Sequence, residues 1–288
     1  MILGKHLTLG ACAFVSAAIV GAGAALDLAF RTRIVFTLTG TCAAVAYLAY
    51  TFQLLQPVFI GSSGRRRPPG CFALTFDDGP DPRSTAAVSE LLAARGHHAT
   101  FFVLGNAARR FPELVRQLAE DGHEVAVHGY DHRLLAFSLP DTVRSQIAST
   151  EAAVMAATGR PPTGLFRAPH GVRSLWLART VAGVGYRLCG WDGRIFDTAN
   201  HGADVVAKRV RAELQEGAVI LLHDGDGSGQ GSSRQQTVQA LPEILDDAEA
   251  RGLHSVWLST LLPMELGSSS LARSRPRASA PDRRSPTR

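Results

Sequence analysis

From residue 68 onward, short apolar runs alternate with segments of helical spacing, and this alternation constrains the fold more than any other feature. The apolar runs lie at 72–76, 99–103, 124–127, 164–166, 186–190, 218–222 and 254–258, and the helical segments at 84–95, 112–120, 141–157, 174–182, 204–215 and 236–250. Such alternation predicts an α/β domain with a mostly parallel sheet that closes, or nearly closes, into a distorted (β/α)7-type barrel. An open doubly wound sheet is the alternative, but no glycine-rich dinucleotide fingerprint follows the first strand.

Two segments with almost no charge precede this domain, at residues 7–26 and 34–55. Each is long enough to cross a bilayer, which takes about 20 residues. We therefore predict an N-terminal membrane hairpin of two transmembrane helices within residues 1–60. A cleaved signal peptide over residues 1–26 is the alternative for the first segment. The flanking arginines slightly favour both ends of the hairpin inside the cell.

The remaining boundaries follow from composition. We expect a linker at 61–69, the main domain at 70–262 and a disordered basic tail at 263–288, since the tail is rich in Ser, Pro and Arg and poor in large apolar residues. The formal charge of +5 includes six basic groups and one acid in residues 1–67, and six arginines and one acid in residues 268–288. The domain between them keeps 18 basic and 23 acidic groups, a net charge of −5. This balance argues against nucleic acid as a partner.

Acids and histidines follow two of the predicted strands. The stretch Cys71 to Pro80, CFALTFDDGP, ends an apolar run in Asp77 and Asp78, and His128 and His132 follow the run 124–127. The carboxyl ends of parallel strands meet at one rim, and residues four apart on a helical turn share a face. Two histidines and one carboxylate with an open position are typical of a catalytic zinc or similar divalent site. A solvated DDGP turn and two unrelated histidines are the alternatives.

Three more strand ends carry polar groups. Arg167 follows the run 164–166, Trp191 and Asp197 follow 186–190, and His223 ends 218–222. An arginine beside acids is suited to pair with a carboxylate and to hold it ionised. We therefore expect Asp, His, Arg, Asp and His from five strand ends to gather at one rim.

These motifs resemble the polysaccharide deacetylases with a NodB homology domain, carbohydrate esterase family 4, over about residues 70–260. TFDDGP at 75–80 matches the first motif, and HGYDH at 128–132 the second, with Gly129 where Ser or Thr is usual. RAPHG at 167–171 resembles the third motif, with His170 where an aromatic residue is commoner. Trp191 and Asp197 fit the fourth, in which Arg194 and Thr198 depart from the pattern, and LLH at 221–223 fits the fifth. The resemblance implies that the metal-binding and catalytic chemistry is retained and that the substrate is atypical.

The resemblance also implies roles. Asp78, His128 and His132 would hold one divalent ion, zinc first, with cobalt, nickel or manganese as alternatives. Asp77 would be the general base, paired with Arg167, and His223 the general acid, supported by Asp197. Trp191, Leu221 and His170 would contact the substrate, with the backbone N–H near His170 facing the oxyanion.

The implied reaction is metal-dependent hydrolysis of N-acetyl groups, and the implied partner is an N-acetylated glycan of the cell envelope, peptidoglycan or chitin-like. A lipid-linked sugar at the cytoplasmic membrane face is one alternative, and a non-catalytic carbohydrate-binding module is another. We expect the protein at the cell membrane. The substrate class slightly favours an extracytoplasmic domain, against the charge pattern. The oligomeric state is left open.

Overall fold

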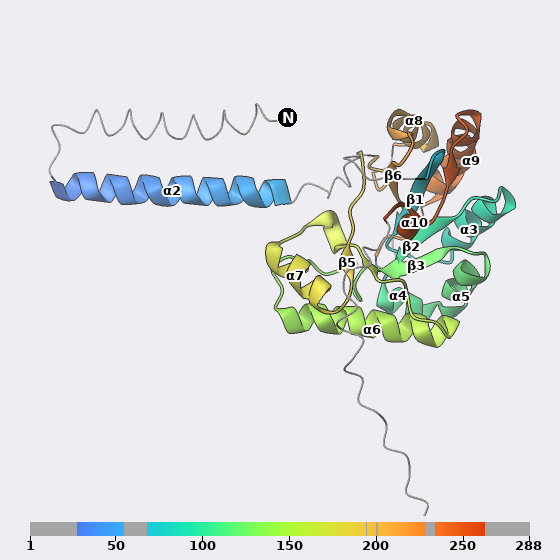
Figure 1. Cartoon of the computed structure of the whole chain (residues 1–288), viewed down its shortest axis with the longest axis horizontal. Helices are drawn as coiled ribbons and strands as arrows, with labels where there is room; N and C mark the ends of the chain where they lie inside the picture. Colours follow the sequence, from blue (N-terminus) through green and yellow to red (C-terminus); the bar gives the residue numbers. More distant parts are fainter. Residues whose placement is uncertain (1–27, 55–67, 194, 200, 228–233, 263–288) are drawn as a thin grey trace, which may run out of the picture.

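The computed structural model describes residues 28–54, 68–193, 195–199, 201–227 and 234–262 (Figure 1). Its centre is strand β1 (Cys71–Asp77), which pairs with β2 (Ala99–Val103) on one side and with β6 (Val219–His223) on the other. The sheet continues from β2 through β3 (Glu124–Val127), β4 (Leu165–Phe166) and β5 (Arg187–Leu188), and β7 (His254–Ser255) pairs with the start of β1. Every pairing is parallel, which confirms the predicted α/β class.

The sheet curls into an incomplete barrel. Its two edges are β5 and β6, and no ladder joins them within the described residues. One isolated parallel bridge, Asp192 to Ile220, brings the segment after β5 onto β6. The predicted barrel is therefore a curled parallel sheet whose closure rests on that single bridge.

The helices pack around this sheet (Figure 1). They are α3 (Thr85–Ala94), α4 (Gly105–Arg110), α5 (Pro112–Glu120), α6 (Pro140–Thr158), α7 (Leu175–Gly183), α8 (Ala203–Glu213), α9 (Gln235–Ala250) and α10 (Leu258–Leu261), with a 3-10 turn η2 (Pro169–Gly171). The six predicted helices match α3, α5, α6, α7, α8 and α9 within two residues at each end. The short helix α4 was not predicted, because six residues are too few to show a helical period.

The predicted strand at 254–258 is wrong in its second half. Strand β7 stops at Ser255, because its ladder partners are only Cys71 and Phe72. The N–H of Leu258 donates to the Thr100 hydroxyl at 2.8 Å instead of to a strand, and Leu258 begins α10. An apolar run shows burial, and only the partner strand decides how far a ladder extends.

Alternate side chains of β1 belong to two different apolar clusters. Phe72, Leu74 and Phe76 enter the larger apolar cluster, which includes residues of α3, α8 and α9, whereas Ala73 packs in a second cluster with Phe102 of β2. Successive side chains of a strand point to opposite faces, so Thr75 and Asp77 share the face of Ala73. The inner face of the curled sheet therefore carries polar groups at the carboxyl end of β1.

The segment before the domain is helical over α2 (Leu28–Leu54). Among the described residues, no helix is both long enough and apolar enough to span a membrane. The first predicted span (7–26), most of the linker and the tail lie outside the described residues. The membrane hairpin stays a prediction.

Two buried histidines lie at the amino end of the sheet, before β2 and β3. His97 accepts a hydrogen bond at Nδ1 from the Ser255 N–H (3.0 Å), and its Nε2 lies 3.2 Å from Glu249. His123 accepts one at Nδ1 from the Ala99 N–H (3.4 Å), and its Nε2 lies 3.3 Å from the Ser89 carbonyl. Burial lowers the pKa of both imidazoles. Because each Nδ1 is an acceptor, the fold requires the neutral ring with its proton on Nε2.

We therefore expect the domain to lose stability in acid. A histidine with a lowered folded-state pKa contributes stability above the unfolded value of about 6.5 and loses it as the pH falls below that value. Denaturant unfolding is measured at pH 5 to 8 with chelator present. The free energy of unfolding should depend less on pH for His123→Gln than for wild type. The exposed His201→Gln is the matched control. If the free energy of unfolding of His123→Gln varied with pH as steeply as that of wild type, the assigned role of His123 would be wrong.

Candidate metal centre and active site

Backbone strain is concentrated at the carboxyl end of the sheet. Within the described residues, four non-glycine residues have positive φ: Asp78 (73°), His132 (59°), His170 (61°) and Phe196 (53°). All four line the same cleft, whose volume is about 440 Å³. Such conformations cost of order 1–3 kcal/mol each and cluster at functional sites. The strain therefore marks the cleft independently of any motif.

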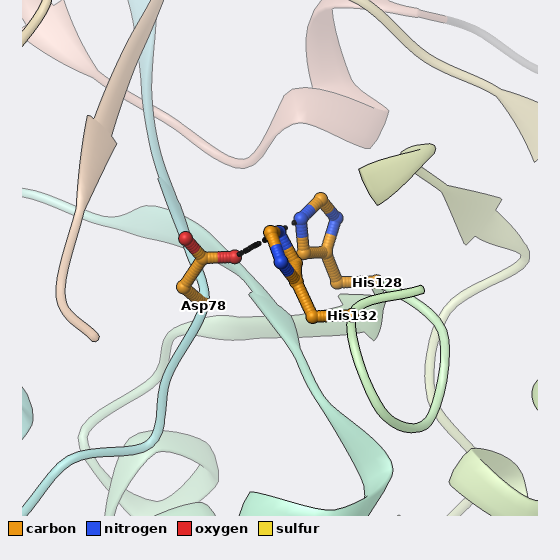
Figure 2. Close-up of side chains that lie close together, drawn as sticks. All are labelled: Asp78, His128 and His132. Atoms are coloured by element: carbon orange, nitrogen blue, oxygen red, sulfur yellow. Dashed lines mark ion pairs between the residues drawn. The ribbon is translucent and has the colours of Figure 1, made fainter. Parts of the chain in front are cut away.

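Three metal-ligating side chains converge in this cleft (Figure 2). One ligand atom from each of Asp78, His128 and His132 lies within 4.8 Å of the others. Asp78 Oδ1 is 3.2 Å from His128 Nε2 and 2.9 Å from His132 Nε2. Burial alone would raise the pKa of the Asp78 carboxyl, but the two imidazoles hold it well below its usual range. The carboxylate is therefore ionised and points at both rings.

The donor set fits a divalent cation. Asp78 Oδ1 is buried, yet no hydrogen bond of adequate geometry reaches it despite the two nearby nitrogens. A buried carboxylate oxygen without a donor is costly unless a cation binds it. The Nδ1 of His128 lies 3.0 Å from the Arg167 carbonyl, so a proton held on Nδ1 leaves the Nε2 lone pair directed at Asp78. Two imidazole nitrogens and one carboxylate oxygen suit zinc and similar ions.

Asp77 stands beside this cluster and is held by Arg167. The guanidinium NH1 donates to Asp77 Oδ1 at 2.8 Å and to the Thr75 hydroxyl at 2.8 Å, and NH2 donates to the Gly190 carbonyl at 3.0 Å. The Arg167 side chain is fully buried and lies over the Phe102 ring, 4.1 Å from its centre. Asp77 Oδ2 is left on the side of His128, at 3.7 Å from Nε2. One oxygen of Asp77 is thus bound and the other is directed to the metal cluster.

His223 lies opposite Asp77. The β1–β6 ladder puts the two residues in register, so neighbouring strands present them side by side. Asp197 accepts from the His223 backbone N–H at 2.7 Å with Oδ2 and lies 2.8 Å from the ring Nδ1 with Oδ1. Burial lowers the pKa of His223, but Asp197, followed by Asp78 and Asp77, raises it to about 9. The ring is therefore cationic at neutral pH, with Nδ1–H bound by Asp197.

Comparison with known proteins decides the family. The family profile described as Polysaccharide deacetylase matches residues 64–189. A chitooligosaccharide deacetylase of Bradyrhizobium sp. (strain ANU 289) is 35% identical over 185 residues, which cover 62% of this chain and 84% of the relative. The chain belongs to the polysaccharide deacetylase family.

Two further comparisons agree. A peptidoglycan-N-acetylglucosamine deacetylase of Bacillus cereus is 34% identical over 192 residues, 66% of this chain and 87% of the relative. The crystal structure of a peptidoglycan N-acetylglucosamine deacetylase in complex with 4-naphthalen-1-yl-N-oxidanyl-benzamide has a TM-score of 0.63 at 30% identity, over 68% of this chain and 89% of that one. As a family 4 carbohydrate esterase with a complete ligand set, the protein is a metal-dependent deacetylase that acts on N-acetyl groups.

The structure of this deacetylase brings together all ten residues singled out in the sequence. Asp77, Asp78, His128, His132, His170, Trp191, Asp197, Leu221 and His223 line the cleft, and Arg167 lies beneath it, bound to Asp77. Trp191 packs against Gly171, where an added Cβ would lie 2.4 Å from the indole. The His170 ring contacts that of His132, with 4.4 Å between ring centres. The strand-end pattern therefore located the site, whereas the roles of its residues are proposals taken up below.

The sequence pattern did not single out the residues that hold the loop of His128 and His132. Gln146 Oε1 accepts from the Tyr130 N–H at 2.6 Å, and the Thr150 hydroxyl donates to the Gly129 carbonyl at 2.9 Å. Gly129 has φ of +85°, a conformation that a residue with a Cβ rarely adopts. Side chains of α6 therefore hold the backbone of the loop at Gly129 and Tyr130. Two polar residues four apart on the apolar face of a helix were the available signal.

A second missed residue is Asp224, which is fully buried behind Asp78. Its Oδ2 accepts from the Thr85 hydroxyl at 2.6 Å, and its N–H donates to the Asp77 carbonyl at 3.2 Å. Burial raises the pKa of Asp224 to about 7, although Thr85 opposes the shift. Asp224 fixes the loop after β1 from the end of β6, and its place directly after His223 was its only sequence signal.

We expect His132→Ala to lose the metal. Removing one of three ligands should weaken binding by more than the about 10–100-fold typical for loss of an outer partner. Titration of the metal-free protein with Zn²⁺, followed by calorimetry and elemental analysis, measures this. His170→Ala is the control, because His170 touches His132 but is not among the three ligands, and it should keep the ion. Retention of the metal by His132→Ala would refute the site.

We expect Asp197→Asn to shift the alkaline limb of the pH profile of kcat/KM. Asp197 raises the pKa of His223, so its neutralisation lowers that pKa, by about one to three pH units for a charge this close. If the reaction needs cationic His223, the activity lost as the pH rises is then lost earlier, so the alkaline limb moves to lower pH. Asp192→Asn, in the same segment, should leave the limb in place. Thermal unfolding of both variants separates this effect from loss of folded protein.

Proposed function

We propose that this deacetylase hydrolyses the N-acetyl groups of amino sugars in a cell-envelope glycan, peptidoglycan or a chitin-like chain. The observation that carries the proposal is the convergence of Asp78, His128 and His132 in a cleft flanked by Asp77 and His223. Relatives named for chitooligosaccharides and for peptidoglycan N-acetylglucosamine support the substrate class. Both substrates carry an acetamide on a sugar ring.

Asp78, His128 and His132 would hold the divalent ion, and we propose zinc, with cobalt, nickel or manganese as alternatives. When bound, the ion supplies a Lewis acid that polarises the acetamide carbonyl and lowers the pKa of water. The imidazole nitrogens favour a borderline ion over magnesium or calcium, which prefer oxygen ligands.

The residues of the chain supply the proton transfers. Asp77 takes a proton from the attacking water on Oδ2, while Arg167 keeps the carboxylate oriented through Oδ1. The new C–O bond forms on the acetamide carbon, and the backbone N–H near His170 faces the oxyanion. His223 donates its Nε2 proton to the departing amine as the C–N bond breaks, and Asp197 stabilises the cationic ring that gives it. The products are acetate and the free amino sugar.

Trp191 and Leu221 line the cleft beside His223 and form the apolar wall for the acetyl methyl group. Phe196, half exposed at the mouth, adds an aromatic surface that a sugar ring can contact.

A lipid-linked sugar is the second candidate substrate, since two charge-poor segments of bilayer length precede the domain. Release of acetate from chito-oligosaccharides, peptidoglycan and lipid-linked amino sugars, with and without chelator, separates the two. A reporter fused after Arg288 tells on which side of the membrane the domain lies, and a cytoplasmic reporter rules out wall polymer. If no acetate were released from any of the acetylated sugars with metal added, a non-catalytic binding module would be favoured.

We expect Asp77→Asn to lose turnover and to keep the metal. General-base removal typically costs about 10²–10⁴-fold in rate. Acetate release and metal content are measured on the same preparation. Asp141→Asn, a 95% exposed acid outside the cleft, is the control and should stay active. An active Asp77→Asn would assign the base elsewhere.

A further inference from the structure

The three metal ligands come from two loops that no strand ladder joins directly. Asp78 follows β1, whereas His128 and His132 follow β3 (Figure 2). Strand β2 lies between β1 and β3 in the sheet, so the two ligand-bearing strands are not neighbours. The segment after β2 bonds the carbonyls of Gly79 and Gly129, which are the neighbours of ligands. The separation of Asp78 and His132 therefore depends on contacts outside the ladder.

One short segment, residues 224–227, lies against both loops. It directly follows β6 and contains two glycines. A Cβ added at Gly225 would lie 2.2 Å from the carbonyl oxygen of Asp78. A Cβ added at Gly227 would lie 3.2 Å from Cγ of the His132 ring and 3.3 Å from its Nδ1. We call residues 224–227 the glycine clasp, because they touch the backbone of one metal ligand and the ring of another.

The two glycines of the clasp are required for different reasons. Gly225 does not have a positive φ, so its backbone would accept other residues, and only the space beside Asp78 excludes a side chain. Gly227 has φ of +75° and also lies against a ring, so both conformation and space favour glycine there. On the facing loop, a Cβ added at Gly79 would lie 2.1 Å from Oδ2 of Asp224. Glycines on both loops therefore allow this close approach.

The clasp is itself held from two sides. The N–H of Asp224 donates to the Asp77 carbonyl at 3.2 Å, and the Ser84 hydroxyl donates to the Asp224 carbonyl at 2.6 Å. Arg234, a buried residue directly before α9, donates from Nε to the Gly225 carbonyl at 2.7 Å. The clasp is thus fixed to the loop after β1 and to the start of α9.

The two histidine ligands are oriented in different ways. The Nδ1 of His128 lies 3.0 Å from the Arg167 carbonyl, and a hydrogen bond of this kind fixes the ring of a metal-binding histidine. His132 has a strained φ of +59°, and its ring lies against Gly227. The direction of the His132 ring therefore depends on packing, and the clasp supplies part of that packing.

We propose that the glycine clasp sets the separation of Asp78 and His132 and thereby pre-organises the metal site. Gly225 and Gly227 are positioning residues in this arrangement, since they act through the ligands and do not bind the ion. The inference rests on the proposed metal site. Because the clasp directly follows His223, the same segment also fixes the proposed acid relative to the ion. Partners outside the ligand set typically change metal affinity by about 10–100-fold.

Metal titration of the full chain, prepared free of metal, tests the clasp. Zn²⁺ binding is measured by calorimetry, and Co²⁺ binding by visible absorption, which reports the geometry of the ligands. We expect Gly225→Ala and Gly227→Ala to bind Zn²⁺ about 10–100-fold more weakly than wild type. The absorption of bound Co²⁺ should also change, because the added methyl group displaces Asp78 or His132.

The chain offers a matched control for each glycine. Gly185 has φ of +85° and nothing within 4 Å of an added Cβ, so Gly185→Ala imposes the backbone strain of Gly227→Ala without its contact. Gly183 does not have a positive φ and likewise has nothing within 4 Å, so Gly183→Ala is the control for Gly225→Ala. Both controls should bind Zn²⁺ and Co²⁺ as wild type does.

A second pair of variants serves if the glycine variants do not fold. Arg234→Met removes the hydrogen bond to the Gly225 carbonyl and should also weaken Zn²⁺ binding. Arg251 donates to the Leu214 carbonyl at 2.7 Å from the other end of α9, so Arg251→Met removes a similar bond far from the clasp and should not. Near-ultraviolet circular dichroism and thermal unfolding without metal show which variants are folded.

The outcomes separate the clasp from the metal site. If wild type bound Zn²⁺ and the folded clasp variants bound it as tightly as their controls, the clasp would be wrong and the metal site would stand. An equal loss of affinity in the control variants would also overturn the clasp, because strain or lost stability would then explain the effect. If wild type bound neither ion, the metal site would be wrong, and the clasp with it. Acetate release is not part of the readout.

Discussion

The site depends on one buried side chain, the guanidinium of Arg167. Arg167 at the end of β4 binds Asp77 and Thr75 of β1 and the Gly190 carbonyl after β5, so its guanidinium ties three parts of the curled sheet from the inside. Removing one partner of such a buried pair typically costs about 3–5 kcal/mol, because the other charge is left unpaired. The carbonyl of the same residue faces the ring of His128. One residue therefore sets both the orientation of the proposed base and that of a metal ligand.

The strained backbone around the cleft is stable because other elements hold it. Asp78 and His132 adopt left-handed conformations that a free chain would avoid. Gln146 and Thr150 of α6 bind the loop of the two histidines, and Asp224 binds the loop of the two aspartates. Helix α6 and strand β6 thus supply the free energy that keeps the ligands converged. A metal ion adds to an arrangement that the protein already specifies.

The extent of what could be predicted follows from the range of the interactions. Periodicity placed α5 and most strand starts well, because burial on one face repeats along a single segment. It failed at 254–258, because the strand there, β7, pairs with only Cys71 and Phe72 of β1. It also could not show that Asp192 bridges to Ile220. Gln146 looked like any helical glutamine, since its role appears only when α6 lies against the loop of Tyr130. The first span of the predicted membrane hairpin, 7–26, lies outside the described structure, and the hairpin stays a prediction.

The sequence by itself determined that acids, histidines and an arginine end neighbouring parallel strands, and therefore that they meet at one edge. It also carried the motifs that assign the family. Only the tertiary structure decided which atoms face each other: that Asp78 Oδ1 faces both imidazoles, and that Arg167 reaches Asp77 across 90 residues of chain. The reason is physical. Strand ends follow from local patterns, whereas contacts between distant segments depend on how every element packs at once.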